Sequence, residues 1–367
     1  MPPAITNYEC YEVPPRWCFV KLETSDGLVG WGEPIVEGRS KTVRAAVEEL
    51  LDGYLLGEDP GRIEHHWQRM YRGGFYRGGP ILTSAIAGID QALWDLKGKR
   101  LGVSVARLLG GQDRSAVRAY ATGHFWPDVD SFEGIRESVV AEAAGHVDAG
   151  FDALKNKIGF GRHPDFPWGW REDVELVRAI REAVGDDVRL MTDANHAYDL
   201  ATASRVGQKL ADLDVYWLEE PVRPHAKENY AHLNETLDVP LAGGECWAFE
   251  HEFSRVLDLD GVGVTQPDVT SAGGLTSTRR VATLSDSHNV QCVPHVFGSA
   301  VALAASLQVL ATIGGDPMLE FDRTPNPIRE DLAVDPITNE GNSVSIPDAP
   351  GIGVEIDPDV LASFRTD

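Results

Sequence analysis

Three acidic residues recur at an equal interval in the middle of this chain. Asp193 and Glu219 are 26 residues apart, as are Glu219 and Glu245, and each ends a short, mostly apolar run. An interval of this length accommodates one strand, one helix and two short loops, the repeating unit of a parallel α/β barrel. Because the carboxyl ends of the strands carry the functional residues of such barrels, the interval predicts that the three carboxylates meet at one barrel mouth.

The order of strand and helix patterns predicts how the chain is divided. Residues 5–35 alternate apolar and polar positions around a Ser25-Asp26-Gly27 turn, and helical patterns follow, which predicts an α+β domain at 1–115. From 116 to 325, strand and helix patterns alternate, which predicts a parallel α/β barrel. We expect residues 326–367 to pack back on the first domain. The predicted helices of the first domain are 41–54, 60–72 and 81–98, and the predicted barrel strands are 117–122, 152–157, 188–193, 215–219, 240–245, 261–265, 290–294 and 318–321.

Charge and hydropathy exclude several classes of partner. The chain has 367 residues with 33 basic and 57 acidic side chains, a formal net charge of −24. Nucleic acids and anionic membrane surfaces bind basic patches, so we expect neither as a partner. No apolar run is long enough to span a membrane, and no secretory signal is visible at the N-terminus, which predicts a cytoplasmic location. An acidic, lysine-poor surface is typical of adaptation to a high-salt cytoplasm.

Two lysines lie at the end of the second predicted barrel strand. Lys155 and Lys157 flank Asn156, and because strand side chains alternate, both lysines point to the same side of the sheet. At a barrel mouth, their like charges and their burial favour a neutral lysine, which can act as a base. The alternative is a pair of surface lysines at a strand edge, in a chain that contains only eight lysines.

The three equally spaced carboxylates are candidate ligands of a metal ion. Mg²⁺ prefers oxygen ligands and keeps coordination positions open for a substrate, so Asp193, Glu219 and Glu245 at neighbouring strand ends predict an Mg²⁺ site. Glu220 is adjacent to Glu219, but the two cannot both face inward, and the regular interval favours Glu219. Taken singly, each acid fits a loop or a helix N-cap equally well.

A histidine and two further acids follow the last three predicted strands. Asp268 follows the sixth strand and His295 the seventh, so the carboxylate can orient the imidazole and raise its basicity. His295 and the lysines would then lie on opposite sides of the barrel mouth, with a base for either face of a substrate. Glu320 is a candidate acid that hydrogen-bonds to the substrate. The alternative for His295 is a histidine in a strand-end turn without a catalytic role, and the alternative for Glu320 is an acid without a function.

Three further residues are candidate substrate contacts. Asn195 lies two positions after Asp193, His124 follows the first predicted barrel strand, and Tyr76 belongs to a glycine-rich loop before the long helix of the first domain. The loop also carries several arginines, which suits it to covering the barrel mouth and binding an anionic substrate, although a surface position fits it equally well.

These motifs together resemble the enolase superfamily, and within it the mandelate-racemase-like branch. The resemblance extends over essentially the whole chain. It implies an N-terminal capping domain, a (β/α)₇β modified TIM barrel and one Mg²⁺ per subunit. The motifs that carry it are, in order, Lys155-x-Lys157, Asp193-Ala194-Asn195, Trp217-Leu218-Glu219-Glu220-Pro221, Gly243-Gly244-Glu245, Gln266-Pro267-Asp268, Pro294-His295 and Glu320.

The resemblance also implies a role for each residue. The expected reaction is abstraction of the proton α to a substrate carboxylate, with a Lys or His base and Mg²⁺ at the enediolate. Asp193, Glu219 and Glu245 would bind the metal, and Glu320 would donate to the substrate carboxylate. Lys157 would be the base on one face, with Lys155 lowering its pKa, and the His295–Asp268 pair would be base or acid on the other.

Within this branch, several stretches resemble cycloisomerases that open aldarate lactones. They include Pro294-His295-Val296-Phe297-Gly298 and Glu320-Phe321-Asp322-Arg323-Thr324-Pro325. Sugar-acid dehydratases, racemases and epimerases share the catalytic set and remain alternatives, as does a non-catalytic protein that binds sugar acids. An insertion at 163–170 beside Lys157 leaves the substrate open. The family resemblance further implies a homo-oligomer, either a dimer or an octamer.

Overall fold

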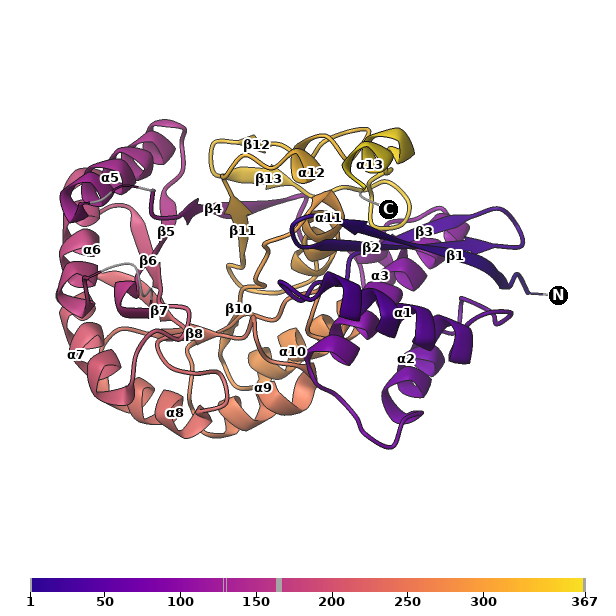
Figure 1. Ribbon diagram of the computed structural model, residues 1–367, viewed down its shortest axis with the longest axis horizontal. Helices are drawn as coiled ribbons and strands as arrows, with labels where there is room; N and C mark the ends of the chain where they lie inside the picture. The colour runs from indigo at the N-terminus through magenta and orange to yellow at the C-terminus, as the bar shows by residue number, and fades with distance from the viewer. Residues whose placement is uncertain (1, 128, 130, 163–166, 366–367) are drawn as a thin grey trace.

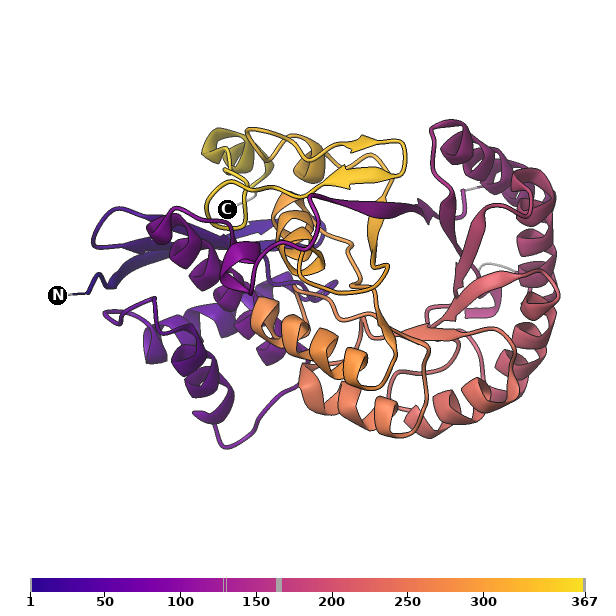
Figure 2. The ribbon, with the colours of Figure 1, turned by 180° about the vertical axis from the view of Figure 1, so that it is seen from behind.

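The chain folds into a ring of strands and helices with a smaller sheet-and-helix unit against one side (Figures 1 and 2). The computed structural model describes residues 2–127, 129, 131–162 and 167–365, except the side chains of His124 and Arg162. Part of the 163–170 insertion therefore lies outside the described residues. Within the described ranges, no helix is both long and apolar enough to cross a membrane.

The smaller unit is an antiparallel sheet covered by helices. Apolar side chains of the sheet, such as Val20 and Leu22, pack against Val47 and Leu51 of the first helix. The longest helix starts with Pro80 at its first position, where a missing N–H is tolerated, and ends at Gly102 in the left-handed conformation. The elements are β1 (Ile5–Val13), β2 (Trp17–Thr24), β3 (Val29–Gly32), α1 (Ser40–Tyr54), α2 (Ile63–Arg72), α3 (Pro80–Leu101) and α4 (Val105–Leu108).

The ring is a barrel of parallel strands whose helices lie on the outside (Figure 1). Its strands are β4 (Ala116–His124), β5 (Ala153–Lys157), β6 (Arg189–Asp193), β7 (Val215–Glu219), β8 (Leu241–Gly243), β9 (Val264–Thr265), β10 (Gln291–Cys292) and β11 (Met318–Asp322). The intervening helices are α5 (Phe132–Asp148), α6 (Trp170–Val184) after a short 3₁₀ turn η1 (Phe160–Arg162), α7 (Leu200–Ala211), α8 (Lys227–Thr236), α9 (Phe249–Asp258), α10 (Gly274–Ser287) and α11 (Ala300–Leu310).

Strand order follows chain order, and the last barrel strand returns to the first. Neighbours from β4 to β10 pair in parallel, and β11 pairs in parallel with β4. Lys157 pairs with Asp193 and Asp193 with Glu219, so three charged residues stand side by side across β5, β6 and β7. The predicted fold class, a (β/α)₇β barrel with an N-terminal α+β cap, is confirmed.

The C-terminal segment contacts both parts of the molecule. It contains α12 (Pro327–Glu330), β12 (Asn339–Glu340), β13 (Ser343–Ser345) and α13 (Pro358–Phe364). Strand β13 pairs antiparallel with β4, while Gly351 forms a bridge with Ser104 next to the first unit. The division of the chain at residues 115 and 325 stays a prediction.

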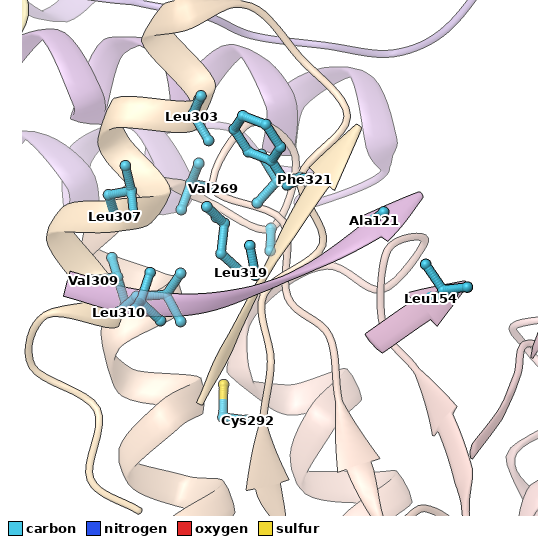
Figure 3. Close-up of a cluster of buried hydrophobic side chains, with 14 of the residues drawn as sticks. Ala121, Leu154, Val269, Cys292, Leu303, Leu307, Val309, Leu310, Leu319 and Phe321 are labelled. Carbon is cyan, nitrogen blue, oxygen red and sulfur yellow. The ribbon is translucent and has the colours of Figure 1, made fainter. Parts of the chain in front are cut away.

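Alternate side chains of the barrel strands pack in two different cores. One set faces the outer helices; Figure 3 shows Leu319 and Phe321 of β11 beside Leu303 and Leu307 of α11. The other set forms a separate apolar cluster inside the barrel, made of Tyr120, Ala153, Met191, Trp217, Ala242, Val264, Val293 and Met318. The interior is therefore filled, and polar side chains that continue its rows must lie at the carboxyl-end mouth.

Buried hydrogen bonds fasten the cap to the barrel. Asp90 of α3 accepts from Thr276 Oγ1 at 2.6 Å and from Thr276 N at 2.9 Å, and Gln91 donates to Val269 O at 2.8 Å. Glu33, after β3, accepts from the backbone N–H of Ser299 at the start of α11. Because these groups are buried, an unpaired one would cost about 1–3 kcal/mol, so the contacts fix the cap beside the loops that follow β9 and β10.

Three barrel strands are shorter than the sequence pattern predicts. Strand β8 stops at Gly243 because Gly244 has φ +147°, and a Cβ there would lie 2.8 Å from the backbone of Gln266. Strand β10 ends at Cys292, shortly before Pro294, which has no N–H to donate to a neighbouring strand, whereas β9 ends at Thr265 as predicted but begins only at Val264. The residues after these breaks turn into the barrel mouth.

Candidate active site

The charged residues of the mouth continue the inward-facing rows of the strands. On β5, Lys155 and Lys157 follow the interior residue Ala153 at intervals of two, and on β6 Asp193 follows Met191 in the same way. On β7, Glu219 follows Trp217, whose Nε1 donates to Glu219 Oε2 at 3.2 Å. The alternation predicted from the sequence therefore brings these side chains to the same side of the barrel.

Both lysines are paired with carboxylates. Lys155 Nζ lies 2.6 Å from Glu219 Oε1 and 2.7 Å from Glu320 Oε1, and Lys157 Nζ donates to Asp193 Oδ2. Burial opposes the charge of Lys155, but Glu219 and Glu320 outweigh it and raise its pKa well above the usual value. The pKa of Lys157 is raised as well, since Asp193 outweighs burial and the neighbouring Lys155.

The expectation of a neutral lysine is therefore wrong for this arrangement. It considered the repulsion between Lys155 and Lys157 but not the carboxylates that the fold places around both. Asp193 experiences the reverse effect: burial opposes its charge, yet Lys157 and Lys155 hold its pKa below the ordinary range. Any group that draws Asp193 away from Lys157 weakens the largest of the interactions that raise the pKa of this lysine.

The three equally spaced carboxylates converge. Asp193, Glu219 and Glu245 each offer an oxygen, and these oxygens lie within 4.8 Å of one another. Gln266 Nε2 donates to Glu219 Oε2 at 2.6 Å, and Asn195 N to Asp193 Oδ1 at 2.8 Å, which fixes two of the three side chains. Glu245 Oε2 is buried and accepts no hydrogen bond from any described residue. An all-oxygen set with an unsatisfied member fits a divalent cation such as Mg²⁺.

A second group of potential ligands lies on the adjacent residues. His196, Glu220 and Cys246 also meet within 4.8 Å, and His196 Nε2 lies 2.5 Å from Glu220 Oε2. This set mixes nitrogen, oxygen and sulfur, which Mg²⁺ disfavours. Burial, followed by repulsion from Glu245 and Asp193, raises the pKa of Glu220 well above its usual value. The regular interval thus singled out the three acids that make the oxygen set.

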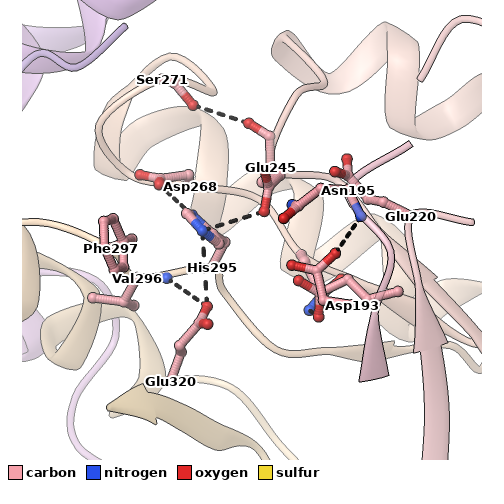
Figure 4. Close-up of polar contacts among 12 residues, drawn as sticks. Asp193, Asn195, Glu220, Glu245, Asp268, Ser271, His295, Val296, Phe297 and Glu320 are labelled. Carbon is pink, nitrogen blue, oxygen red and sulfur yellow. Dashed lines mark hydrogen bonds and ion pairs between the residues drawn. The ribbon is translucent and has the colours of Figure 1, made fainter. Parts of the chain in front are cut away.

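His295 is held by the carboxylate of Asp268 at the barrel mouth (Figure 4). Its Nδ1 lies 2.6 Å from Asp268 Oδ2, and Asp268 Oδ1 is fixed by the N–H and hydroxyl of Thr270. The free side of the ring, Nε2, lies 3.3 Å from Glu245 Oε2 and 3.9 Å from Glu320 Oε2. Burial opposes the charge, but Glu245, Glu320 and Asp268 together raise the pKa of His295 to about 10.

Glu320 connects the two sides of the mouth. One oxygen pairs with Lys155, and the other accepts the N–H of Val296 at 3.1 Å. Burial favours the neutral acid, but Lys155 and His295 outweigh it and lower the pKa of Glu320. A carboxylate at this position can interact with both Lys155 and His295. The predicted hydrogen bond from Glu320 to a substrate stays a prediction.

A cavity of about 870 Å³ opens above these groups. Lys157, Asn195, Glu245, His295 and Glu320 line it, so the predicted bases of both faces reach the same space. The cap contributes the turn between β1 and β2 to its wall. Sequence reasoning missed these cap residues, Arg16 and Trp17, as well as Phe297 of the barrel. The Pro14-Pro15 pair indicates a turn there, but nothing in the sequence shows that the turn reaches the barrel.

The structure does not bring every candidate residue to the cavity. Tyr76 is 86% exposed, stacks edge-on against Phe75 and lines a separate hollow of the cap. Gly78 and Gly79, both at positive φ, turn the chain after it. Its expected substrate contact is therefore not supported by its position. The side chain of His124 lies outside the described residues, and the roles assigned to the remaining site residues stay predictions.

Family comparison agrees with this geometry. Residues 14–110 match the N-terminal domain of the mandelate racemase / muconate lactonizing enzyme family, and residues 138–360 match the enolase C-terminal domain-like family. The chain belongs to the enolase superfamily. Within it, the match to the N-terminal domain places the chain in the mandelate racemase and muconate lactonizing enzyme branch.

Several relatives of the chain have named activities. It is 40% identical to the D-galactarolactone cycloisomerase of Agrobacterium fabrum, over 94% of this chain and 90% of that protein. It is also 40% identical to a D-galactonate dehydratase of Ralstonia pickettii, over 96% and 92%. Among solved structures, the 3,6-anhydro-D-galactonate cycloisomerase of Zobellia galactanivorans superposes with a TM-score of 0.90 at 35% identity, covering 99% of this chain and all of that one.

Proposed function

We propose that this enzyme, a sugar-acid isomerase or lyase of the enolase superfamily, opens an aldarate lactone by removing the proton α to its free carboxylate. The observation that carries the proposal is the shared cavity, in which Lys157 lies against Asp193 and His295 against Glu245, two members of a carboxylate triad suited to a divalent cation. The 40% identity to a galactarolactone cycloisomerase over nearly the full length supports the substrate class.

Asp193, Glu219 and Glu245 would hold Mg²⁺. When bound, this ion supplies positive charge where the substrate carboxylate gains electrons as its α C–H bond breaks. Asp193, the partner of Lys157, would be one of the ligands of this ion, so it would neutralise the lysine less. Lys157 is then the candidate base on its face of the substrate.

The remaining steps need no oxidant or co-reactant. As the α proton passes to the base, the electron pair of that C–H bond forms a double bond to the neighbouring carbon. The C–O bond of the lactone ring breaks there, and the ring oxygen leaves with its electron pair as a carboxylate. Protonation of the carbon that lost the oxygen, with loss of the enol proton, gives the 3-deoxy-2-keto diacid. His295, whose pKa is raised by Glu245, Glu320 and Asp268, would return a proton from the opposite side.

A sugar-acid dehydratase is the second candidate. The 40% identity to D-galactonate dehydratases favours it. The first step is the same, but the leaving group is hydroxide, which requires a proton as it departs. His295 is the candidate acid for that step, and the Asp268 contact at 2.6 Å would orient it.

Proton NMR with Mg²⁺ tests both candidates. A panel of aldonates, aldarates and their lactones, including galactarolactone, is incubated with the enzyme, and signals of 3-deoxy-2-keto products are followed. Product from a lactone supports the cycloisomerase, whereas product only from open-chain acids supports the dehydratase. If no acid of the panel exchanges its α proton for deuterium in D₂O, the proposed chemistry is wrong.

A further inference from the structure

One arginine of the cap lines the same cavity as the predicted bases. Arg16 lies in the turn between β1 and β2, and its side chain is only 14% exposed. Its guanidinium stacks on Phe297, with Cζ 4.5 Å from the ring centroid, and Nη2 donates to Phe297 O at 3.4 Å. Phe297 follows His295 by two residues, so the cap turn is held against the loop that carries the histidine.

The guanidinium of Arg16 has few partners for its five N–H groups. Apart from the long bond to Phe297, its nearest carboxylate is Glu37, 3.6 Å from Nη1 and 76% exposed. Nε is buried and finds no acceptor among the residues that the structure describes, and the same holds for Nε1 of the adjacent Trp17. An exposed partner at this distance contributes little, so the charge of Arg16 is only weakly compensated.

Other cationic side chains near the cavity already have carboxylate partners. Lys157 is bound to Asp193, and His295 lies between Asp268 and Glu245. Arg329 donates to Asp322 at 2.6 Å, which neutralises that wall residue. Arg16 is thus the cation of the described cavity wall that lacks a carboxylate within hydrogen-bond distance. Glu37, Glu245 and Glu320 also line the cavity and repel anions, and Arg16 offsets part of this repulsion for an anionic ligand.

We propose that Arg16 binds the second carboxylate of the substrate, the one that an aldarate lactone releases when its ring opens. This inference rests on the proposed function and specifies its substrate as a sugar derivative with a carboxyl group at each end. In the lactone, that group is a neutral ester. Its oxygen gains negative charge only as the C–O bond breaks, so Arg16 would stabilise the transition state more than the bound substrate. A guanidinium is suited to this because it pairs with a carboxylate through two parallel hydrogen bonds.

Binding of two inert open-chain acids would test Arg16 without relying on turnover. Galactarate carries a carboxylate at both ends and galactonate at one, and the chains are otherwise alike. Calorimetry with Mg²⁺ measures both dissociation constants for the wild type, Arg16→Gln, Arg16→Lys and Arg39→Gln, if needed under conditions in which neither acid reacts. Arg39 is an exposed cap arginine that does not line the cavity, so it is the matched control.

We expect the wild type to prefer galactarate and Arg16→Gln to lose about tenfold to a hundredfold in galactarate affinity, with little change for galactonate. Arg16→Lys should retain part of the preference, and Arg39→Gln all of it. Turnover of galactarolactone should fall in kcat more than KM rises for Arg16→Gln.

Other outcomes distinguish a failure of the proposed role of Arg16 from a failure of the proposed function. Equal weakening of both acids by Arg16→Gln, at an unchanged unfolding temperature, would overturn the role of Arg16 while leaving the proposed function intact. The same conclusion follows if the wild type does not discriminate between the acids. If neither acid binds and no α-proton exchange is seen with the wild type, the proposed function fails instead.

Discussion

At the scale of single residues, the proposed chemistry depends on two candidate bases, Lys157 and His295, that line one cavity. Lys157→Ala and His295→Asn should each leave the protein folded, because each removes a side chain that lines the cavity and not one from the barrel core. General acid–base groups contribute about 10²–10⁴ to a rate, so turnover should fall by at least that factor. Deuterium exchange at the α carbon should be lost for the substrate configuration that faces the replaced group.

The measurement combines NMR of α-proton exchange with circular dichroism of each variant. His232→Asn serves as a control, because His232 is an exposed histidine of α8 that does not line the cavity. If both variants at the mouth exchange at the wild-type rate, the assignment of the bases is wrong.

Metal affinity is the second residue-scale prediction. Glu245 is a triad member whose Oε2 accepts no hydrogen bond from the described part of the chain and has His295 Nε2 at 3.3 Å, so a bound cation is expected to be a further favourable partner. Glu245→Gln should weaken Mg²⁺ binding by about tenfold or more, since it removes one of three charges from the ion. Calorimetric titration of the metal-free protein measures this. Glu235→Gln, at an exposed acid of α8, should bind Mg²⁺ as the wild type does; equal affinity of both variants would exclude Glu245 as a ligand.

At the scale of elements, strand periodicity explains what the sequence predicts well. The period of two places Lys155 and Lys157 on one side of β5, and the interval of one βα unit places Asp193, Glu219 and Glu245 at successive strand ends. These relations are local or repeat at a fixed length, so they can be read before the fold is known.

Contacts between distant elements are what the sequence does not predict. Lys155 is kept charged by its contacts with Glu219 and Glu320. These two residues belong to strands far along the chain, and a sequence pattern does not show how close they come to Lys155 in the fold. The same limit applies to Arg16, whose turn reaches the barrel only through the docking of the cap. Tyr76 was predicted to contact the substrate but lies exposed on the cap. The composition of its loop suits ligand binding, but composition does not determine where a loop lies.

Docking of the cap gives an element-scale prediction. The buried carboxylate of Glu33 accepts hydrogen bonds from the N–H groups of Ser299 and Ala302, at the N-terminus of α11, where a negative charge is favourable. Glu33→Ala leaves these donors buried without an acceptor and should lower the free energy of unfolding by about 3 kcal/mol. Because α11 follows the His295 loop, kcat should fall as well.

Urea unfolding at neutral pH measures this change. Glu48→Ala is the control, because Glu48 forms only a surface ion pair with Arg44 on α1, for which a loss within about 1 kcal/mol is expected. Equal stability of the two variants would show that Glu33 does not fasten the cap to the barrel.

At the scale of the whole molecule, net charge sets how stability responds to salt. A formal charge of −24 produces self-repulsion that the folded state concentrates in a smaller volume than the unfolded chain. The Debye length falls from about 10 Å at 0.1 M salt to about 3 Å at 1 M, which screens this repulsion. The unfolding temperature should therefore rise between 0.1 and 1 M KCl.

A charge variant separates screening from other effects of salt. Glu49, Glu137 and Asp187 are exposed acids on separate parts of the surface and lie outside the cavity wall. Replacing all three with lysine changes the net charge from −24 to −18. If self-repulsion is the cause, the triple variant should be more stable than the wild type at 0.1 M KCl and should gain less from 1 M KCl, as differential scanning calorimetry would measure. An equal gain in both proteins would attribute the effect to solvation of apolar surface instead, because that effect does not depend on the protein's charge.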